Sequence, residues 1–193
     1  GRLPGAWLMT RSIAGTAGGR TLKTPPGSGT RPTSDRVREA LFSALAARDR
    51  IAGAHVLDLY AGSGALGLEA ASRGAASVEL VESDRRAAGV IATNITALAV
   101  AGVRVHHRPV GAFLGAGPTA YEGCDLVFID PPYDVEEAAL ADVLDALANG
   151  WLADDALVVV ERSSRSPEPA WPTGWEAEKP RRYGETTLWF AGC

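Results

Sequence analysis

Four consecutive residues, Asp130-Pro131-Pro132-Tyr133, carry groups that could bind and orient an aromatic base with an exocyclic amino group. The Asp130 carboxylate accepts hydrogen bonds when it is ionised, and the Pro131 carbonyl remains an acceptor although proline has no N–H. The two prolines fix φ and stiffen the backbone, so this carbonyl can be aimed at a ligand. Tyr133 offers a flat face for stacking a base. We therefore assign catalytic roles to Asp130, Pro131 and Tyr133.

Two acceptors and a stacking face favour direct in-line transfer of a group to the bound nitrogen, with no covalent enzyme intermediate. Orientation of the reacting atoms would supply much of the rate gain. A proline-rich turn at the end of a strand is the alternative interpretation of these four residues. Their position after an apolar run, residues 125–129, and downstream of a glycine-rich loop favours the chemical interpretation.

The glycine-rich loop spans residues 58–67 and reads DLYAGSGALG. Gly62 and Gly64 let the backbone turn sharply and approach a ligand, and Gly67 lets the following helix pack closely on a sheet. Glu82 lies 20 residues after Gly62 and could accept both ribose hydroxyls of an adenosine. The same spacing is the dinucleotide fingerprint, so the loop alone does not separate NAD from S-adenosylmethionine.

Asp58 favours S-adenosylmethionine as the cofactor. A carboxylate just before the loop suits a cationic methionine amino group, whereas it would repel a pyrophosphate. We expect the cofactor to be held by the loop, by the distal acid and by the segment after the third strand. The assigned cofactor-binding residues are Asp58, Tyr60, Ala61, Gly62, Gly64, Gly67, Glu82 and Val110.

The hydrophobic pattern predicts the elements that position both motifs. Strands are expected at residues 55–60, 77–82, 103–108, 125–130 and 156–161, and helices at residues 65–73, 85–98 and 136–149. Alternation of strand and helix predicts a parallel sheet covered on both faces. The first and fourth strands flank the point where the strand order reverses, so both motifs should face one crevice at the carboxyl ends of the strands.

The last part of the chain departs from this alternation. Strands are expected at residues 175–182 and 186–190, and only three residues join them, which requires an antiparallel hairpin. The predicted fold is α/β, a Rossmann-like class I methyltransferase. Its sheet is mostly parallel, doubly wound and seven-stranded, it ends in an antiparallel hairpin, and it carries a small basic N-terminal extension.

An amphipathic helix precedes this sheet. Ser34 or Asp35 can serve as its N-cap. One apolar face with helical spacing is formed by Val37, Ala40, Leu41, Ala44 and Leu45, and Arg36, Arg38 and Glu39 are expected to point elsewhere.

Charge is distributed unevenly along the chain. Residues 9–50 hold eight basic and three acidic residues, a net charge of +5, whereas residues 51–193 hold ten basic and twenty acidic residues, a net charge of −10. This asymmetry suggests a basic arm on an acidic body, with a solvated tail as the alternative. The residues assigned to binding a nucleic acid, which the family resemblance given below implies to be RNA, are Arg11, Arg20, Lys23, Arg31, Arg36 and Arg38.

We therefore divide the chain into three parts. Residues 1–8 are expected to be a remnant that precedes a native start at Met9. Residues 9–50 form the basic arm and its helix, and residues 51–193 form the methyltransferase domain. A chain of 193 residues with 46% hydrophobic residues suits one globular α/β domain of this size.

Composition argues against several other classes of protein. The longest apolar runs have the length of a strand, well short of the roughly 20 residues that cross a membrane. His106 and His107 would point to opposite faces of a strand, and neither of the two cysteines sits in a CxxC pair, so no metal site is expected. Cys124 precedes the fourth strand, which argues against methylation at a ring carbon by a thiolate. We expect a monomer in a reducing, cytoplasmic setting.

The sequence resembles the amino-directed methyltransferases that carry an (N/D)PP(Y/F) motif. Among them it closely resembles the bacterial small-subunit rRNA guanine-N2 methyltransferases over nearly all of residues 10–190. The family-specific stretches are RSIAG at residues 11–15, Gly18-Gly19-Arg20, Leu22 and RPTSDRVREALF at residues 31–42, together with residues 58–67 and 130–133.

The resemblance implies that the target is a guanine N2 in 16S rRNA of an assembling small ribosomal subunit. One departure concerns the third strand, which is followed by Pro109 and Val110 where many methyltransferases place an Asp or Asn near the adenine. These two residues offer only backbone or apolar contacts.

Two other functions are compatible with parts of the pattern. One is methylation of another amino group, such as adenine N6 or cytosine N4 in DNA or a protein glutamine amide. The other is a non-catalytic RNA-binding or NAD-binding module. The tetrapeptide argues against the module and the basic arm against a protein substrate, while the choice of RNA over DNA rests on the family resemblance.

Overall fold

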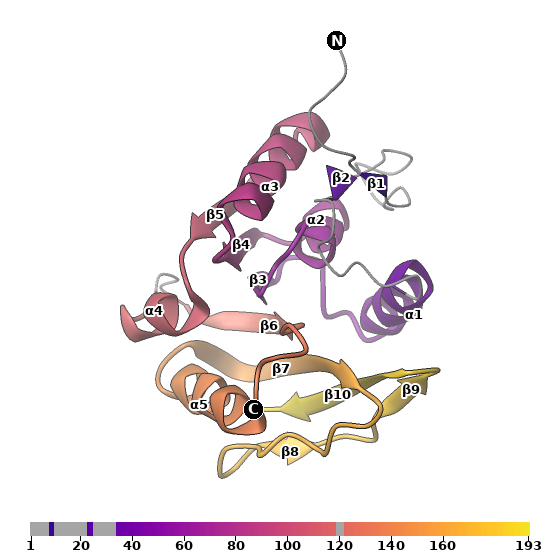
Figure 1. Cartoon of the computed structure of the whole chain (residues 1–193), viewed down its shortest axis with the longest axis vertical. Coiled ribbons are helices and arrows are strands. Elements are labelled where there is room, and N and C mark those ends of the chain that lie inside the picture. Colours follow the sequence, from indigo (N-terminus) through magenta and orange to yellow (C-terminus); the bar gives the residue numbers. More distant parts are fainter. Residues whose placement is uncertain (1–7, 10–22, 25–33, 119–121) are drawn as a thin grey trace.

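The structure, a computed structural model, describes residues 8–9, 23–24, 34–118 and 122–193. Its main sheet has eight strands in the order β5-β4-β3-β6-β7-β10-β8, with β9 also paired to β10 (Figure 1). These strands are β3 (His55–Leu59), β4 (Ser77–Glu82), β5 (Val103–His107), β6 (Cys124–Ile129), β7 (Leu152–Ser163), β8 (Glu176–Ala177), β9 (Arg181–Tyr183) and β10 (Thr186–Gly192). The helices are α1 (Ser34–Ala47), α2 (Ala65–Ser72), α3 (Arg85–Leu98), α4 (Val110–Gly115) and α5 (Glu137–Ala148).

The predicted α/β fold is confirmed. The strands β3 to β7 pair in parallel, and β10 joins β7 antiparallel, as the short link before it requires. The predicted strand at residues 175–182 is broken into β8 and β9, and both halves pair with β10. Pro180 lies in the break and has no N–H to donate to the ladder. The sheet therefore has eight strands where seven were expected.

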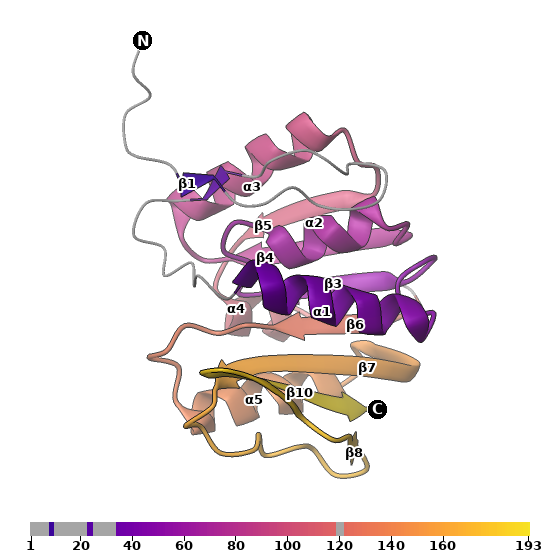
Figure 2. The same ribbon diagram turned by 90° about the vertical axis from the view of Figure 1, so that its right-hand side faces the viewer.

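Helices cover both faces of the sheet because successive strand residues point to opposite sides. One core cluster joins α1 to the sheet through Phe42 and Leu45, which contact a layer containing Leu126 and Phe128. The other cluster lies under α4 and α5 and includes the buried Trp151. Figure 2 shows α1 and α2 in front of the sheet and α5 behind it.

The helix α1 begins at Ser34, so the prediction of Ser34 or Asp35 as its N-cap is wrong. Asp35 lies within the first turn, and the residues directly before Ser34 lie outside the described residues. The apolar face is confirmed, since Val37, Leu41 and Leu45 are buried. Arg38 was expected to point away from this face, and its side chain is only 6% exposed and lies 3.4 Å from the Asp35 carboxylate.

Two short strands lie outside the main sheet. β1 (Leu8–Met9) pairs antiparallel with β2 (Lys23–Thr24), and β2 lies beside α3. Leu8 belongs to the predicted remnant and is paired with Thr24 in this ladder. In the described part of the chain, none of the helices combines the length and apolar character needed to cross a membrane.

Candidate cofactor and base-binding site

The glycine-rich loop turns from β3 into α2 through left-handed backbone. Tyr60, Gly62 and Gly64 have φ values of 60°, 59° and 83°. Gly62 and Gly64 adopt this conformation at little cost, whereas Tyr60 adopts it despite its side chain. A Cβ on Gly64 would lie 3.1 Å from Leu80 Cδ2, so the predicted need for glycine at this turn has a steric cause as well.

Gly67 brings α2 close to the sheet, as predicted. A Cβ at this position would lie 2.8 Å from Leu80 Cδ2 and 3.1 Å from Asp58 Oδ2. The first of these distances is shorter than normal carbon–carbon contact. Glycine at this position therefore lets the first turn of α2 pack against β3 and β4.

Asp58 lies at the start of the glycine-rich loop and binds its last residue. Its side chain is 1% exposed, and its Oδ2 accepts a hydrogen bond of 2.9 Å from the Gly67 N–H. Burial raises the pKa of this carboxyl to about 7, the Gly67 hydrogen bond opposes the increase, and the charge of Glu82 adds to it. Its carboxylate therefore fixes the start of α2, and contact with a cofactor ammonium stays a prediction.

Asp58 should make folding stability depend on pH. Its pKa is about 7 in the folded protein against 3.8 as the ordinary value, so the unfolded chain releases this proton first as the pH rises. The contribution of this group to the free energy of unfolding therefore falls between about pH 4 and 7 and is level above that range. Asp58→Asn keeps an acceptor for the Gly67 N–H and cannot ionise, so it removes the destabilisation that comes from ionising a buried carboxyl. The free energy of unfolding of the variant minus that of the parent protein should be roughly 2–4 kcal/mol larger at pH 8 than at pH 4.

Urea unfolding of both proteins at several pH values measures this difference. The gap should open as the pH rises through the window and then stay constant. Parallel stability curves for the two proteins across the window would contradict a raised pKa for Asp58.

Glu82 joins the loop to the segment after β4. Its Oε1 accepts 2.8 Å from the Gly62 N–H and its Oε2 accepts 2.7 Å from the Asp84 N–H. The predicted role was acceptance of ribose hydroxyls, and the structure adds a second role, because the carboxylate fixes the loop itself. Each carboxylate oxygen can accept more than one hydrogen bond, so both roles are compatible.

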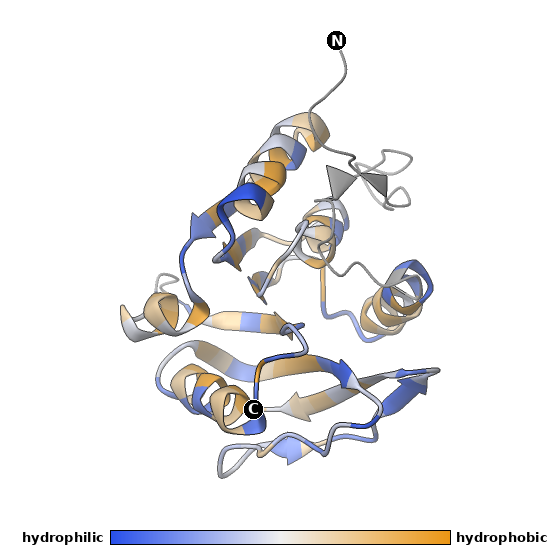
Figure 3. Cartoon of the chain, in the orientation of Figure 1, coloured by the Kyte–Doolittle hydropathy of each residue, from blue (hydrophilic) through white to orange (hydrophobic). Residues whose placement is uncertain are grey.

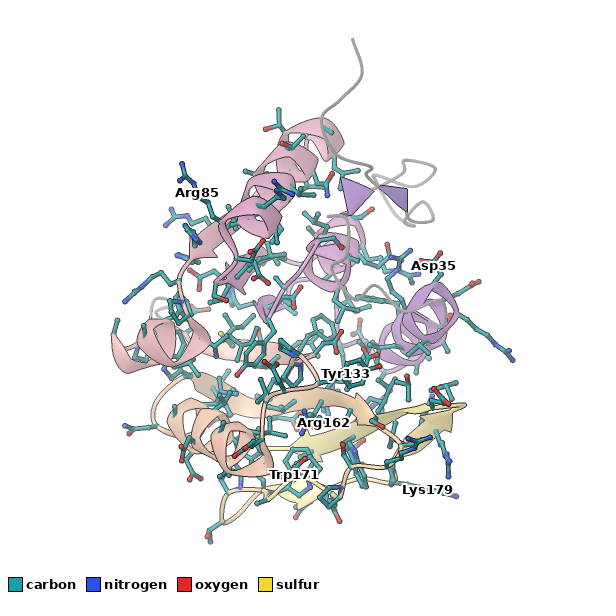
Figure 4. The ribbon with its side chains drawn as sticks, in the orientation of Figure 1. Asp35, Arg85, Tyr133, Arg162, Trp171 and Lys179 are labelled. Atoms are coloured by element: carbon teal, nitrogen blue, oxygen red, sulfur yellow. The ribbon has the colours of Figure 1, made fainter. Side chains whose placement is uncertain are left out.

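The tetrapeptide lies at the same edge of the sheet. β3 and β6 are neighbours and Leu59 pairs with Ile129, so the chain leaves both strands at one level into the two motifs. Asp130 is half-buried and Pro131 is buried. Tyr133 is 68% exposed, and Figure 4 shows it at the front of the molecule, at the end of β6. The ring is therefore available for stacking.

Arg162, at the end of β7, supports the segment that follows the tetrapeptide and was not predicted. Its side chain is 7% exposed. It donates 3.0 Å to the Val135 carbonyl and 2.6 Å to the Glu137 carboxylate. The sequence showed only an arginine at a strand end, because its partners lie more than twenty residues away.

The structure brings only some of the assigned residues together. Val110 is buried at the start of α4, a helix that the sequence analysis did not predict. Arg36 is exposed on α1, whereas Arg38 is buried. The side chains of Arg11, Arg20, Lys23 and Arg31 lie outside the described residues, although the Lys23 backbone belongs to β2.

Other chemical sites that the sequence raised have structural explanations. His106 contacts the Glu79 carboxylate at 3.1 Å, and His107 contacts the Ser83 carbonyl at 3.0 Å. Residues that the structure describes contain no group of three potential metal ligands. Cys124 is the first residue of β6, not a residue before it, and burial raises its pKa to about 12. It lies at the opposite end of the strand from Asp130.

The likeness to known proteins extends over nearly the whole chain. The family model described as "Conserved hypothetical protein 95" matches residues 10–192. The chain is 40% identical over 176 residues to ribosomal RNA small subunit methyltransferase D of Escherichia coli (strain K12), covering 91% of this chain and 85% of that protein. It is 36% identical over 183 residues to the protein of the same name from Haemophilus influenzae, covering 94% and 92%.

Solved structures agree with this assignment. The Escherichia coli protein yhhF superposes with a TM-score of 0.83 at 36% identity, covering 96% of this chain and 98% of that one. Magnesium protoporphyrin IX methyltransferase from Synechocystis PCC 6803, solved with S-adenosylmethionine bound, has a TM-score of 0.64 at 14% identity, covering 82% and 79%. That second likeness concerns the fold alone. The chain belongs to the family of ribosomal RNA small subunit methyltransferase D.

Proposed function

We propose that this protein transfers a methyl group from S-adenosylmethionine to the N2 amino group of a guanine in 16S rRNA of the small ribosomal subunit. The observation that carries the proposal is the juxtaposition of two motifs, the Glu82-clamped glycine loop after β3 and the tetrapeptide after β6. The names of the curated relatives support an rRNA substrate. The choice of guanine N2 rests on the family resemblance of the sequence.

The residues at the end of β3 and β4 fit this cofactor. Gly62 has open space where a Cβ would lie, and the Glu82 oxygens can accept from ribose hydroxyls. The backbone at Val110 is a candidate for the adenine contact. When bound, the cofactor supplies an electrophilic methyl group on a sulfonium.

The residues after β6 would orient the base. Asp130 and the Pro131 carbonyl accept the two hydrogens of the exocyclic amino group, while Tyr133 stacks on the ring. This arrangement directs the nitrogen lone pair at the methyl carbon. As the N–C bond forms and the C–S bond breaks, the nitrogen gains positive charge. In this proposal the Asp130 carboxylate would take the proton that the nitrogen then releases.

The test is a methyl-transfer assay with S-adenosylmethionine on undermodified small ribosomal subunits. We expect one methyl group per particle, and mass mapping should locate it on a guanine of 16S rRNA. Naked 16S rRNA and duplex DNA serve as alternative substrates. Methylation of adenine, of DNA or of a ribosomal protein in place of guanine would contradict the proposal and favour one of the other amino-directed functions.

Arg36 and the arm residues Arg11, Arg20, Lys23 and Arg31 are proposed to contact RNA phosphates. Local positive charge is needed there because the body of the protein is acidic. Arg36 is exposed and supports this role. The buried position of Arg38, beside Asp35, makes it a support for the start of α1.

A further inference from the structure

We infer that a second basic surface, on the β4–β5 side of β3, binds phosphates of the RNA substrate. It consists of Arg85, Arg86, Arg104 and Arg108, here called the β5-edge arginines. The inference rests on the proposed function, because it names a contact surface for the same substrate. It concerns residues of the acidic body, where the charge distribution along the sequence gave no reason to expect an RNA contact.

The β5-edge arginines come from two segments that are neighbours in the fold. Arg85 and Arg86 open α3 directly after β4, whereas Arg104 lies in β5 and Arg108 follows it. The Arg108 N–H donates 3.1 Å to the Glu82 carbonyl, and His107 contacts the Ser83 carbonyl at 3.0 Å. Hydrogen bonds therefore join the two segments at the carboxyl ends of β4 and β5, the end of the sheet where the candidate site lies. Figure 3 shows the first turn of α3 and β5 as hydrophilic, and Figure 4 shows Arg85 projecting outward beside α3.

These side chains are available to a ligand. All four residues are exposed. In the described part of the chain, Arg85, Arg86 and Arg104 form no side-chain hydrogen bond or ion pair, and Arg108 donates only to the Ala112 carbonyl, at 3.3 Å. Arginines elsewhere do pair with carboxylates, and Arg48, Arg50, Arg73 and Arg162 are examples.

The nearby acids are already engaged. Glu82 accepts from two backbone N–H groups, and the Asp84 carboxylate caps α3 through the Ala87 N–H at 2.8 Å. Glu79, which lies opposite Arg104 in the ladder, contacts His106. The positive charge of the β5-edge arginines is therefore not consumed by ion pairs within the described residues, and a polyanion can use it.

Helix stability does not account for Arg85 and Arg86. They occupy the first turn of α3, where the helix dipole disfavours cations, and this turn contains no acidic residue. A residue pair that opposes local stability indicates a function elsewhere. The charge of Arg104 could also protect the exposed edge of β5 against pairing with another chain. The experiment below separates these two roles.

The position of the surface suits a folded RNA. In the sheet order, β4 and β5 lie on one side of β3, and β6, with the tetrapeptide, lies on the other. α1, which carries Arg36, contacts β6 through the rings of Phe42 and Phe128, whose centroids lie 5.6 Å apart. RNA that places a guanine on Tyr133 can thus be held by phosphate contacts on both sides of the bound base.

The test compares two triple variants of equal charge change. The first is Arg85→Gln/Arg86→Gln/Arg104→Gln, which leaves out Arg108 because it adjoins the proposed adenine contact. The control is Arg165→Gln/Lys179→Gln/Arg182→Gln, which removes three exposed positive charges at the β9 side of the sheet. Both are measured on undermodified small ribosomal subunits for Kd at several salt concentrations, KM, kcat and S-adenosylmethionine affinity.

The first variant should bind the particles at least about tenfold more weakly at low salt, with a salt slope smaller by roughly 2, since each phosphate contact contributes about 0.7–0.9 to that slope. Its kcat and cofactor affinity should be unchanged, and its Tm should be equal or higher because α3 loses two unfavourable charges. The control should lose at most twofold.

Three results would overturn the inference. One is an equal loss of affinity for the particles in the two variants. Another is an unchanged Kd and salt slope in the first variant. The third is aggregation of the first variant with normal affinity, which would assign Arg104 to protection of the exposed β5 edge. Failure of the proposed function is a separate result, because the parent protein itself would then not methylate the particles.

Discussion

Replacing Asp130 by alanine should lower kcat for rRNA methylation by a factor of about 10²–10⁴, the range over which a positioned acid–base group contributes. Asp130 follows β6 directly and is half-buried beside the buried Pro131. Its carboxylate is assigned to hold one amino hydrogen and to take the released proton. Removing it leaves the nitrogen lone pair unaligned, whereas the cofactor contacts after β3 and β4 are untouched. The Kd for S-adenosylmethionine should therefore stay within twofold of the parent value.

A matched control lies four residues further along the chain. Asp134→Ala removes an exposed carboxylate of the same segment and should leave kcat near the parent value. Asp130→Asn, which keeps one acceptor oxygen, should fall between the two. Single-turnover methylation of undermodified small subunits, together with calorimetry for the cofactor, measures both quantities. If Asp130→Ala turned over at a rate close to that of Asp134→Ala, the in-line mechanism through the tetrapeptide would be wrong.

Local signals predicted the fold around the site well. The bounds of β4 and α3 match the predicted ranges, because Asp84 provides a side-chain N-cap between an apolar strand and a periodic helix. α4 was not predicted, since it has only six residues, two of which are glycines. Its residues Val110, Phe113 and Leu114 do have helical spacing and are buried, so the periodic signal was present over too short a span to be decisive.

Tertiary partners explain what local patterns could not predict. Arg38 lies on a helix whose polar face seemed to include it, yet it is buried next to Asp35. Arg162 supports the segment after the tetrapeptide through Val135 and Glu137, which are distant in sequence. The β5-edge arginines lie within an acidic part of the chain, and the pairing of β5 with β4 makes their two segments neighbours. Net charge over a long segment therefore concealed a local positive surface.

The glycine-rich loop was predicted in part, because its residues were recognised from the sequence but one of the roles of Glu82 was not. Its glycines and Glu82 were recognised from spacing, and the expected role of the acid was contact with ribose. The structure shows that the same carboxylate also accepts from the N–H groups of Gly62 and Asp84. A side chain that holds the protein and the ligand at once has a larger effect on binding than ribose contact alone would give.

Glu82→Ala should accordingly weaken S-adenosylmethionine binding by roughly 2–4 kcal/mol, which is about 30-fold to 1,000-fold in Kd. The lower part of this range is the loss of acceptors for ribose hydroxyls. The upper part includes loosening of the loop, because two backbone N–H groups lose their charged acceptor. The loss should appear in the cofactor Kd and KM, while the Kd for RNA stays near the parent value.

Glu82→Gln separates the two contributions. An amide keeps one acceptor oxygen but presents a donor in place of the other, so it can hold either Gly62 or Asp84 and not both. Its loss of cofactor affinity should be intermediate. In the absence of cofactor, the Tm should be highest for the parent protein, lower for Glu82→Gln and lowest for Glu82→Ala. Calorimetry with S-adenosylmethionine and with NADH completes the experiment. Two results would contradict the assignment of this carboxylate to a ribose. One is an affinity of Glu82→Ala for S-adenosylmethionine equal to that of the parent protein. The other is binding of NADH, and not of S-adenosylmethionine, by the parent protein.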